Sequence, residues 1–171
     1  MRLGLEMELE AILLEQKLIP GRESLLFFKI LTTKAFEDAN LDVQNHIQSL
    51  EYTYKLLNSY VMPSTKFSLN YLIDFLGISR LIGLNAKKFA DDIYFTAGIF
   101  PKYLEKRLSG KKFYLDCSRR IYRSLSTEQN DAFGQLSANL VIYTKALNVM
   151  REKYLDGNYA KSLMKPNRIL H

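Results

Sequence analysis

Apolar side chains recur at helical spacing along almost the whole chain, and few residues interrupt that pattern. The 171 residues include only 4 prolines and 8 glycines, the two residue types least compatible with a helix interior. In the stretch F-A-D-D-I-Y-F-T-A-G-I-F-P, Phe89, Ile93, Ala97 and Phe100 share one helical face. The periodicity therefore predicts an all-α fold, a bundle of about seven or eight helices.

Breaks in this periodicity divide the chain into predicted helices. I-P-G and M-P-S-T end two of them, and Gly98 with Pro101 is interpreted as a corner. Ser126 or Thr127 is suited to cap the last long helix. The expected helices cover about 3–17, 23–38, 42–60, 68–76, a segment around 89–100, a short one from Pro101 closed by Gly110, 111–125, one from 126 to about 157, and a short tail before Pro166.

The composition indicates one domain in a reducing compartment. A chain of 171 residues with 47% hydrophobic residues can build one sizeable core. We expect a single helical domain over 1–171, with a short flexible tail at about 165–171. The only cysteine, Cys117, excludes an internal disulfide and favours the cytoplasm. Three glutamates within residues 6–10 argue against a signal peptide. The sequence contains no run of 18 apolar residues, so no transmembrane segment is predicted.

Two adjacent aspartates, Asp91 and Asp92, raise the question of a metal site. Carboxylates are the ligands that Mg²⁺ prefers, but neighbours on a helix point about 100° apart and do not easily share one ion. A further carboxylate one turn on is missing, because Phe95 and Thr96 stand there. The pair is interpreted instead as negative charge near the start of a helix, where it is stabilising.

Other metal and nucleophile signals are weak. The only histidines, His46 and His171, belong to no cluster of zinc ligands. Cys117 falls on the apolar face of its predicted helix with Phe113 and Ile121, which is typical of a small buried hydrophobe. We therefore assign no catalytic residue, no metal and no cofactor.

Residues 68–91 resemble a helix-turn-helix loosely. G-I-S would form the turn, and Arg80, Lys87 and Lys88 would lie on the second helix, which in that motif enters the major groove. Ile73 occupies a position where the motif needs a small residue, and Gly83 stands where the second helix should bury a branched side chain. Two core helices joined by a turn explain the segment more simply.

Positive charge is concentrated in residues 101–123. This segment holds 8 basic and 2 acidic residues, so its own net charge equals the net charge of +6 of the whole chain. Such a field would attract an anionic partner, with Tyr103, Tyr114 and Tyr122 interleaved for stacking on bases; the alternative is a solvated face. The basic residues are Lys102, Lys106, Arg107, Lys111, Lys112, Arg119, Arg120 and Arg123.

Residues 89–104 are similar to a pattern in a group of uncharacterised bacterial helical proteins, written GD-x-x-LF-x-x-GFFP and followed by GR-x-x-Y-x-x-L. The matching residues are Asp91, Phe95, Gly98, Phe100 and Pro101, then Tyr114, Arg120, Tyr122 and Leu125, and residues 132–140 resemble the next helix start. The chain departs from the pattern at Ala90 and at Cys117–Ser118. The resemblance implies a bacterial helical protein and carries no activity.

Three functional classes follow from these features. We expect a non-enzymatic helical module that binds a protein partner or itself, because no catalytic constellation appears. A nucleic-acid-binding regulator would use 101–123, or less readily 68–91, and peripheral contact with an anionic membrane is a weaker alternative. A small-ligand protein or enzyme would need a pocket formed only in the fold, with Tyr94, Tyr114 and Arg120 as the candidate lining.

Overall fold

The computed structural model describes residues 22–61, 84–107, 109–128 and 130–154, within which all regular secondary structure is helical. Six helices follow in chain order: α2 (Arg22–Asp38), α3 (Ile47–Val61), α5 (Leu84–Ile99), α6 (Pro101–Glu105), α7 (Gly110–Leu125) and α8 (Ala132–Tyr154). The all-α prediction is confirmed for this part of the chain. The helices expected at about 3–17, 68–76 and before Pro166 lie outside the described residues, as does most of the segment 68–91.

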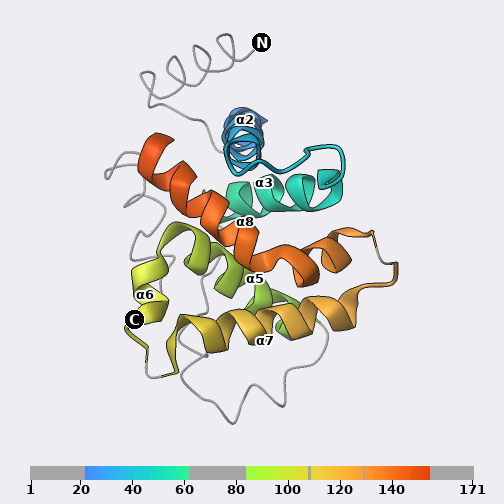
Figure 1. The fold of residues 1–171 in the computed structure, drawn as a ribbon, viewed down its shortest axis with the longest axis vertical. Coiled ribbons are helices and arrows are strands. Elements are labelled where there is room, and N and C mark those ends of the chain that lie inside the picture. The colour runs from blue at the N-terminus through green and yellow to red at the C-terminus, as the bar shows by residue number, and fades with distance from the viewer. Residues whose placement is uncertain (1–21, 62–83, 108, 129, 155–171) are drawn as a thin grey trace.

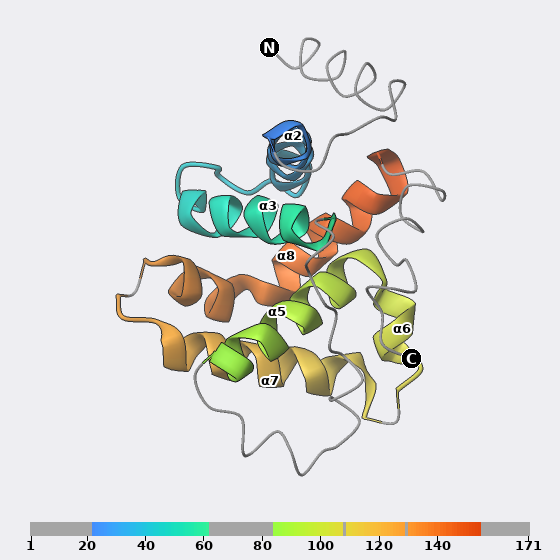
Figure 2. The same cartoon turned by 180° about the vertical axis from the view of Figure 1, so that it is seen from behind.

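α8 is the helix around which the others are arranged. It packs against α2, α3, α5 and α7. Figures 1 and 2 show α2 and α3 on one side of α8, with α5, α6 and α7 on the other side. None of the described helices is long and apolar enough to span a bilayer.

α5 is buried on every side from Phe89 onward, whereas Lys87 and Lys88 near its start are partly exposed. All residues from 89 to 99 are buried, although the sequence predicted only one buried face along Phe89, Ile93 and Ala97. The cause is that α5 contacts α3, α6, α7 and α8 together. A helix enclosed in this way must satisfy its polar side chains inside the protein.

Gly98 lies inside α5 and does not form a corner. A Cβ atom at this position would be 2.6 Å from Leu147 Cδ1, so the glycine allows α5 and α8 to approach closely. Asn148 of α8 adds amide hydrogen bonds to the carbonyl oxygens of Ala97 and Gly98. The corner itself falls at Phe100, and Pro101 opens α6 as predicted.

The last long helix begins later than Ser126 or Thr127. α8 starts at Ala132, and Asp131 caps it by accepting a hydrogen bond from the backbone N–H of Gly134 at 2.6 Å. The second carboxylate oxygen of Asp131 accepts the backbone N–H of Thr127 at 2.8 Å. One side chain therefore fixes both the preceding turn and the helix start.

The buried face of α7 differs from the predicted stripe. Phe113, Cys117, Ile121 and Leu125 are only partly buried. The buried residues of α7 are Tyr114, Leu115, Ser118 and Tyr122. Polar atoms on this face have partners on α5: the Ser118 hydroxyl donates to the carbonyl oxygen of Ala90 at 3.0 Å.

Candidate ligand cleft between helices α3 and α5

The two adjacent aspartates lie in the middle of α5, not near its start. α5 begins at Leu84, and the exposed fractions of Asp91 and Asp92 are only 4% and 1%. Buried carboxylates are costly unless they are paired and hydrogen-bonded. Because neighbouring side chains on a helix diverge by about 100°, each carboxylate reaches a different set of partners.

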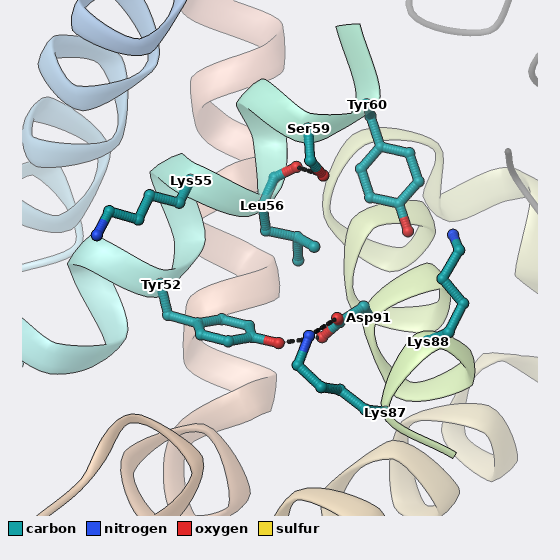
Figure 3. A pocket seen from close by; sticks show the side chains of 8 residues that line it. All are labelled: Tyr52, Lys55, Leu56, Ser59, Tyr60, Lys87, Lys88 and Asp91. Atoms are coloured by element: carbon teal, nitrogen blue, oxygen red, sulfur yellow. Dashed lines mark hydrogen bonds and ion pairs between the residues drawn. The ribbon is translucent and has the colours of Figure 1, made fainter. Parts of the chain in front are cut away.

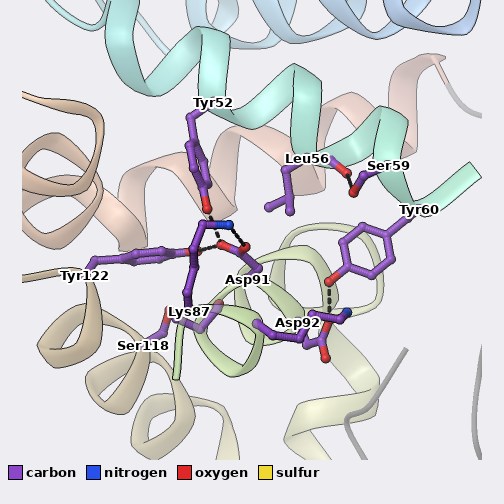
Figure 4. Close-up of polar contacts among 11 residues, drawn as sticks. Tyr52, Leu56, Ser59, Tyr60, Lys87, Asp91, Asp92, Ser118 and Tyr122 are labelled. Carbon is purple, nitrogen blue, oxygen red and sulfur yellow. Dashed lines mark hydrogen bonds and ion pairs between the residues drawn. The ribbon is translucent and has the colours of Figure 1, made fainter. Parts of the chain in front are cut away.

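Asp91 joins three helices (Figure 4). Its Oδ1 atom accepts the hydroxyl of Tyr52 from α3 at 2.6 Å and the hydroxyl of Tyr122 from α7 at 2.7 Å. Its Oδ2 atom accepts a hydrogen bond from Nζ of Lys87 at 3.0 Å. Lys87 precedes Asp91 by four residues, so the ion pair follows one face of α5.

Asp92 repeats this arrangement toward the other end of α3. Its Oδ1 atom accepts the hydroxyl of Tyr60 and lies 2.6 Å from Nζ of Lys88, again four residues earlier. Tyr60 also stacks on Phe95, with ring centres 4.0 Å apart. The two Tyr–Asp–Lys sets fix α3 against α5 at positions two helical turns apart on α3.

The tyrosines act as fixed donors in these sets. Burial and the charge of Asp91 raise the pKa of Tyr52 and Tyr122 well above the ordinary value. Burial and the charge of Asp92 do the same for Tyr60. All three hydroxyls therefore stay protonated at neutral pH and keep donating to the carboxylates.

A cleft of about 380 Å³ opens between α3 and α5 beside these sets (Figure 3). The cleft is lined by Tyr52, Lys55, Leu56, Ser59, Tyr60, Lys87, Lys88 and Asp91. The side chains of Lys87 and Lys88 are 40% and 39% exposed, while their partner carboxylates are buried behind them. The lysines are therefore the more exposed partners of both ion pairs, although Asp91 also lines the cleft.

The lysines are held over aromatic rings. Nζ of Lys87 lies 5.4 Å from the ring centre of Tyr52, and Nζ of Lys88 lies 5.0 Å from that of Tyr60. Cation–π attraction and the ion pairs together restrain both ammonium groups. Lys55 stands at the edge and pairs with exposed Glu51 at 2.6 Å. The cleft thus combines aromatic walls with pre-positioned hydrogen-bond donors.

The residues expected to line a pocket are placed elsewhere. Tyr94 is fully buried and shares a 2.8 Å hydrogen bond with Thr53. Tyr114 is buried on α7, and Arg120 is exposed on the same helix. None of the three lines the α3–α5 cleft. Sequence reasoning missed the cleft residues, although the two Lys–Asp pairs at i, i+4 were a visible signal.

The predicted basic segment divides into engaged and exposed groups. Nε of Arg119 donates to the carbonyl oxygen of Ser137 at 2.9 Å. Nζ of Lys111 lies 3.8 Å from Oε1 of Glu105. The guanidinium carbon of Arg107 lies 4.6 Å from the ring centre of Tyr103. The exposed members are Lys102, Lys106, Lys112, Arg120 and Arg123. Tyr114 and Tyr122 are buried, so their rings are not available for stacking on bases.

His46 and Cys117 have local structural roles. His46 Nδ1 lies 2.6 Å from the hydroxyl of Tyr143 and so links the start of α3 to α8. Burial raises the pKa of the Cys117 thiol, despite the opposing effect of Arg120, which disfavours the reactive thiolate. Within the described residues, no group of three or more His, Cys, Asp or Glu side chains is placed to hold a metal ion.

No protein-family model, curated protein or solved structure matches this chain. The resemblance to a group of bacterial helical proteins stays a prediction.

Proposed function

We propose that the protein is a non-enzymatic regulatory module that recognises a small anion in the α3–α5 cleft. The observation that carries this proposal is that Lys87 and Lys88, whose side chains are 40% and 39% exposed, line a cleft together with Tyr52 and Tyr60. Ligand sites commonly combine apolar walls with a few placed polar groups in a volume of about 300 to 1,000 Å³.

The two lysines are suited to an anion because they are already ordered. An ammonium group has three donors, and the carboxylates approach from the protein side, which leaves the outward donors to a ligand. Restraint by Asp91, Asp92 and the tyrosine rings lowers the entropy lost when a ligand binds. The best match is a small planar anion, whose ring would pack on Tyr52 and Leu56, because the ring of Tyr60 is already covered by Phe95 and Lys88.

The state of the polar groups favours binding over catalysis. A general base needs an acceptor that is free to take a proton from a substrate. Both oxygens of Asp91 already accept hydrogen bonds, and the neighbouring tyrosines stay protonated because burial raises each pKa. These groups serve better to hold a ligand than to transform one.

Phenyl phosphate is a suitable probe, because it joins a planar ring to a doubly charged head. We expect calorimetric titration of the whole chain to give a dissociation constant below about 1 mM. The double variant Lys87→Gln/Lys88→Gln should weaken binding at least about tenfold, which is about 1.4 kcal/mol. The matched control is Lys29→Gln/Lys145→Gln, which replaces two exposed lysines of α2 and α8 and should bind as the wild type does.

Two results would overturn the proposal. One is the absence of binding heat with both phenyl phosphate and benzoate. The other is equal affinity in the wild type and the double lysine variant, since the anion would then be held elsewhere. Circular dichroism of each variant confirms that the helices are retained, so loss of binding cannot be attributed to unfolding.

A protein partner, or a second copy of the chain, is the other role expected from the sequence. One observation favours it: α8 exposes Val141, Ile142 and Val149. Isolated exposed hydrophobics are also common on monomers, so self-association stays a prediction, and sedimentation equilibrium at several protein concentrations tests it. Bacterial origin and a cytoplasmic location likewise stay predictions.

A further inference from the structure

We propose that the outward face of α6 and α7 binds the sugar–phosphate backbone of a nucleic-acid duplex without reading its bases. The exposed basic residues of α6, of the turn after it and of α7 are Lys102, Lys106, Lys112, Arg120 and Arg123, and together they are termed the basic face. The role is separate from the α3–α5 cleft, since no residue of the basic face lines that cleft.

The charge of the basic face is not neutralised locally. Among the described residues, none of its five cations lies within 4.0 Å of a carboxylate, whereas the other basic residues of the segment are engaged. Asp116 lies on the same side of α7, but it pairs with Arg119 at 3.9 Å. Net positive charge therefore faces the solvent along both helices.

The arrangement of the cations suits a polyanion. Lys112 and Arg123 are separated by eleven residues of one helix, which is about 16 Å along its axis, and Arg120 lies between them. The opposite side of α7 is fixed to the core by Tyr114, Leu115, Ser118 and Tyr122. The cations thus extend from a rigid helix at an edge of the described bundle (Figure 1).

The absence of apolar anchors distinguishes nucleic acid from other anionic partners. The large hydrophobic residues that the described chain exposes lie on α2, α3 and α8, and none lies on α6 or α7. Amphipathic helices that lie on a membrane surface bury an apolar face in the lipid beside their basic residues. The centres of protein interfaces are likewise apolar and aromatic. Charge alone is sufficient for contacts with phosphates.

The buried tyrosines favour a duplex over a single strand. Proteins that bind single strands stack bases on exposed aromatic rings, but Tyr114 and Tyr122 are buried, and the guanidinium of Arg107 lies over the partly buried ring of Tyr103. Contact limited to phosphates gives weak, sequence-independent binding, with dissociation constants of about 10⁻⁴ to 10⁻⁶ M at physiological salt. Its affinity should fall steeply as the salt concentration rises.

The test is fluorescence anisotropy of a labelled DNA duplex of about 20 base pairs and arbitrary sequence, titrated with the full chain between about 50 and 200 mM salt. If three to five phosphates are contacted, the plot of log K against log salt has a slope of about −3 to −4.5. Lys112→Gln/Arg120→Gln/Arg123→Gln should make this slope shallower by about 2 to 2.7, since each lost phosphate contact removes about 0.9, and should lower the affinity at least about tenfold.

The matched control removes the same charge from other helices. Lys29→Gln/Lys145→Gln/Lys153→Gln replaces three exposed lysines of α2 and α8 and should keep the slope of the wild type. Equal loss of affinity in both triple variants would show that only the net charge matters and would overturn the proposal. It would also be overturned by the absence of duplex binding at the lowest salt, or by equal or tighter binding to phosphatidylserine vesicles or polyglutamate.

Discussion

Gly98 determines how closely α5 and α8 can pack. A Cβ atom there would lie 2.6 Å from Cδ1 and 2.9 Å from Cβ of Leu147, which is itself buried. We expect Gly98→Ala to destabilise the protein by about 1 to 2 kcal/mol, because overpacking a core costs about 1 to 3 kcal/mol and the gain in helix propensity offsets only part of it. Urea denaturation measures this difference.

Leu147→Ala provides the control for this prediction. In the wild type, the truncation should cost about 2 to 5 kcal/mol because it leaves a cavity. In the Gly98→Ala background, the added methyl group occupies part of that space, so the same truncation should cost less. Equal costs in the two backgrounds would show that the contact between Gly98 and Leu147 does not limit the packing.

Asp91 and Asp92 show what residue patterns reveal and what they leave out. The sequence shows a helix, a carboxylate pair and lysines four residues before each carboxylate. It does not show that Tyr52 and Tyr122, which are 39 and 31 residues away from Asp91, donate to its carboxylate. Without these partners, the sequence favours reading the pair as negative charge near the start of a helix. Long-range polar contacts of this kind depend on how the helices cross, which local periodicity does not encode.

At the scale of elements, the start of α8 depends on Asp131. Burial alone would raise the pKa of Asp131, but the backbone N–H groups of Gly134, Thr127 and Glu128 outweigh it and hold that pKa well below its ordinary value. Ser126, Thr127 and Asp131 are all good capping residues. Sequence reasoning chose the first two, because it could not see that the chain makes a turn before the helix.

We expect Asp131→Ala to destabilise the protein by about 1 to 2 kcal/mol near neutral pH, the usual cost of a lost N-cap. A carboxylate with a lowered native pKa contributes stability above its unfolded pKa and loses it as the pH falls through the native pKa. The difference between the wild type and the variant should therefore be complete above about pH 5 and shrink toward pH 2. Urea denaturation at several pH values measures it.

Asp131→Asn separates the capping oxygen from its charge. The amide oxygen can still accept the N–H of Gly134, so this variant should retain part of the stability near neutral pH. Its difference from Asp131→Ala should not change with pH in the acid range, because neither side chain titrates. A wild-type advantage over alanine that persists undiminished at low pH would contradict the role given to the ionised carboxylate.

The elements themselves were predicted more reliably than the faces they bury. The ranges 23–38 and 111–125 agree closely with α2 and α7, whereas the starts predicted at 42 and 126 precede those of α3 at Ile47 and α8 at Ala132. The prediction of which face of α7 is buried was wrong, because it followed the apolar residues at i+4 spacing, which include Phe113 and Cys117. Tyr114, Ser118 and Tyr122 are buried instead, because α5 supplies acceptors for Ser118 and Tyr122.

At the scale of the whole molecule, buried and partly buried tyrosines join the described helices in addition to the apolar core. Tyr52 and Tyr60 of α3, Tyr94 of α5 and Tyr122 of α7 all place their hydroxyls in hydrogen bonds between different helices. The sequence predicted an all-α bundle with a substantial core. It could not predict the polar links, because each requires two helices to meet at a particular angle and height.

These tyrosines should make the folded protein unstable at alkaline pH. Burial is the largest cause that raises the pKa of Tyr52, Tyr60, Tyr94 and Tyr122 above the ordinary value of 10.0. A raised native pKa contributes stability that is fully present below the unfolded pKa and is lost as the pH rises toward the native value. Each tyrosine should therefore reduce the free energy of unfolding by about 1.4 kcal/mol per pH unit above 10.

We expect cooperative unfolding within about 2 pH units above pH 10, with loss of helical circular dichroism and a simultaneous rise of tyrosinate absorbance. Tyr122→Phe removes one ionising group, so its stability should fall less steeply with pH above 10, by about 1.4 kcal/mol per unit. The same variant should be less stable near neutral pH, by about 1 kcal/mol for the lost hydrogen bond to Asp91. Tyrosinate absorbance that rises fully around pH 10 while the helical signal persists would show that these hydroxyls are not buried in the native protein.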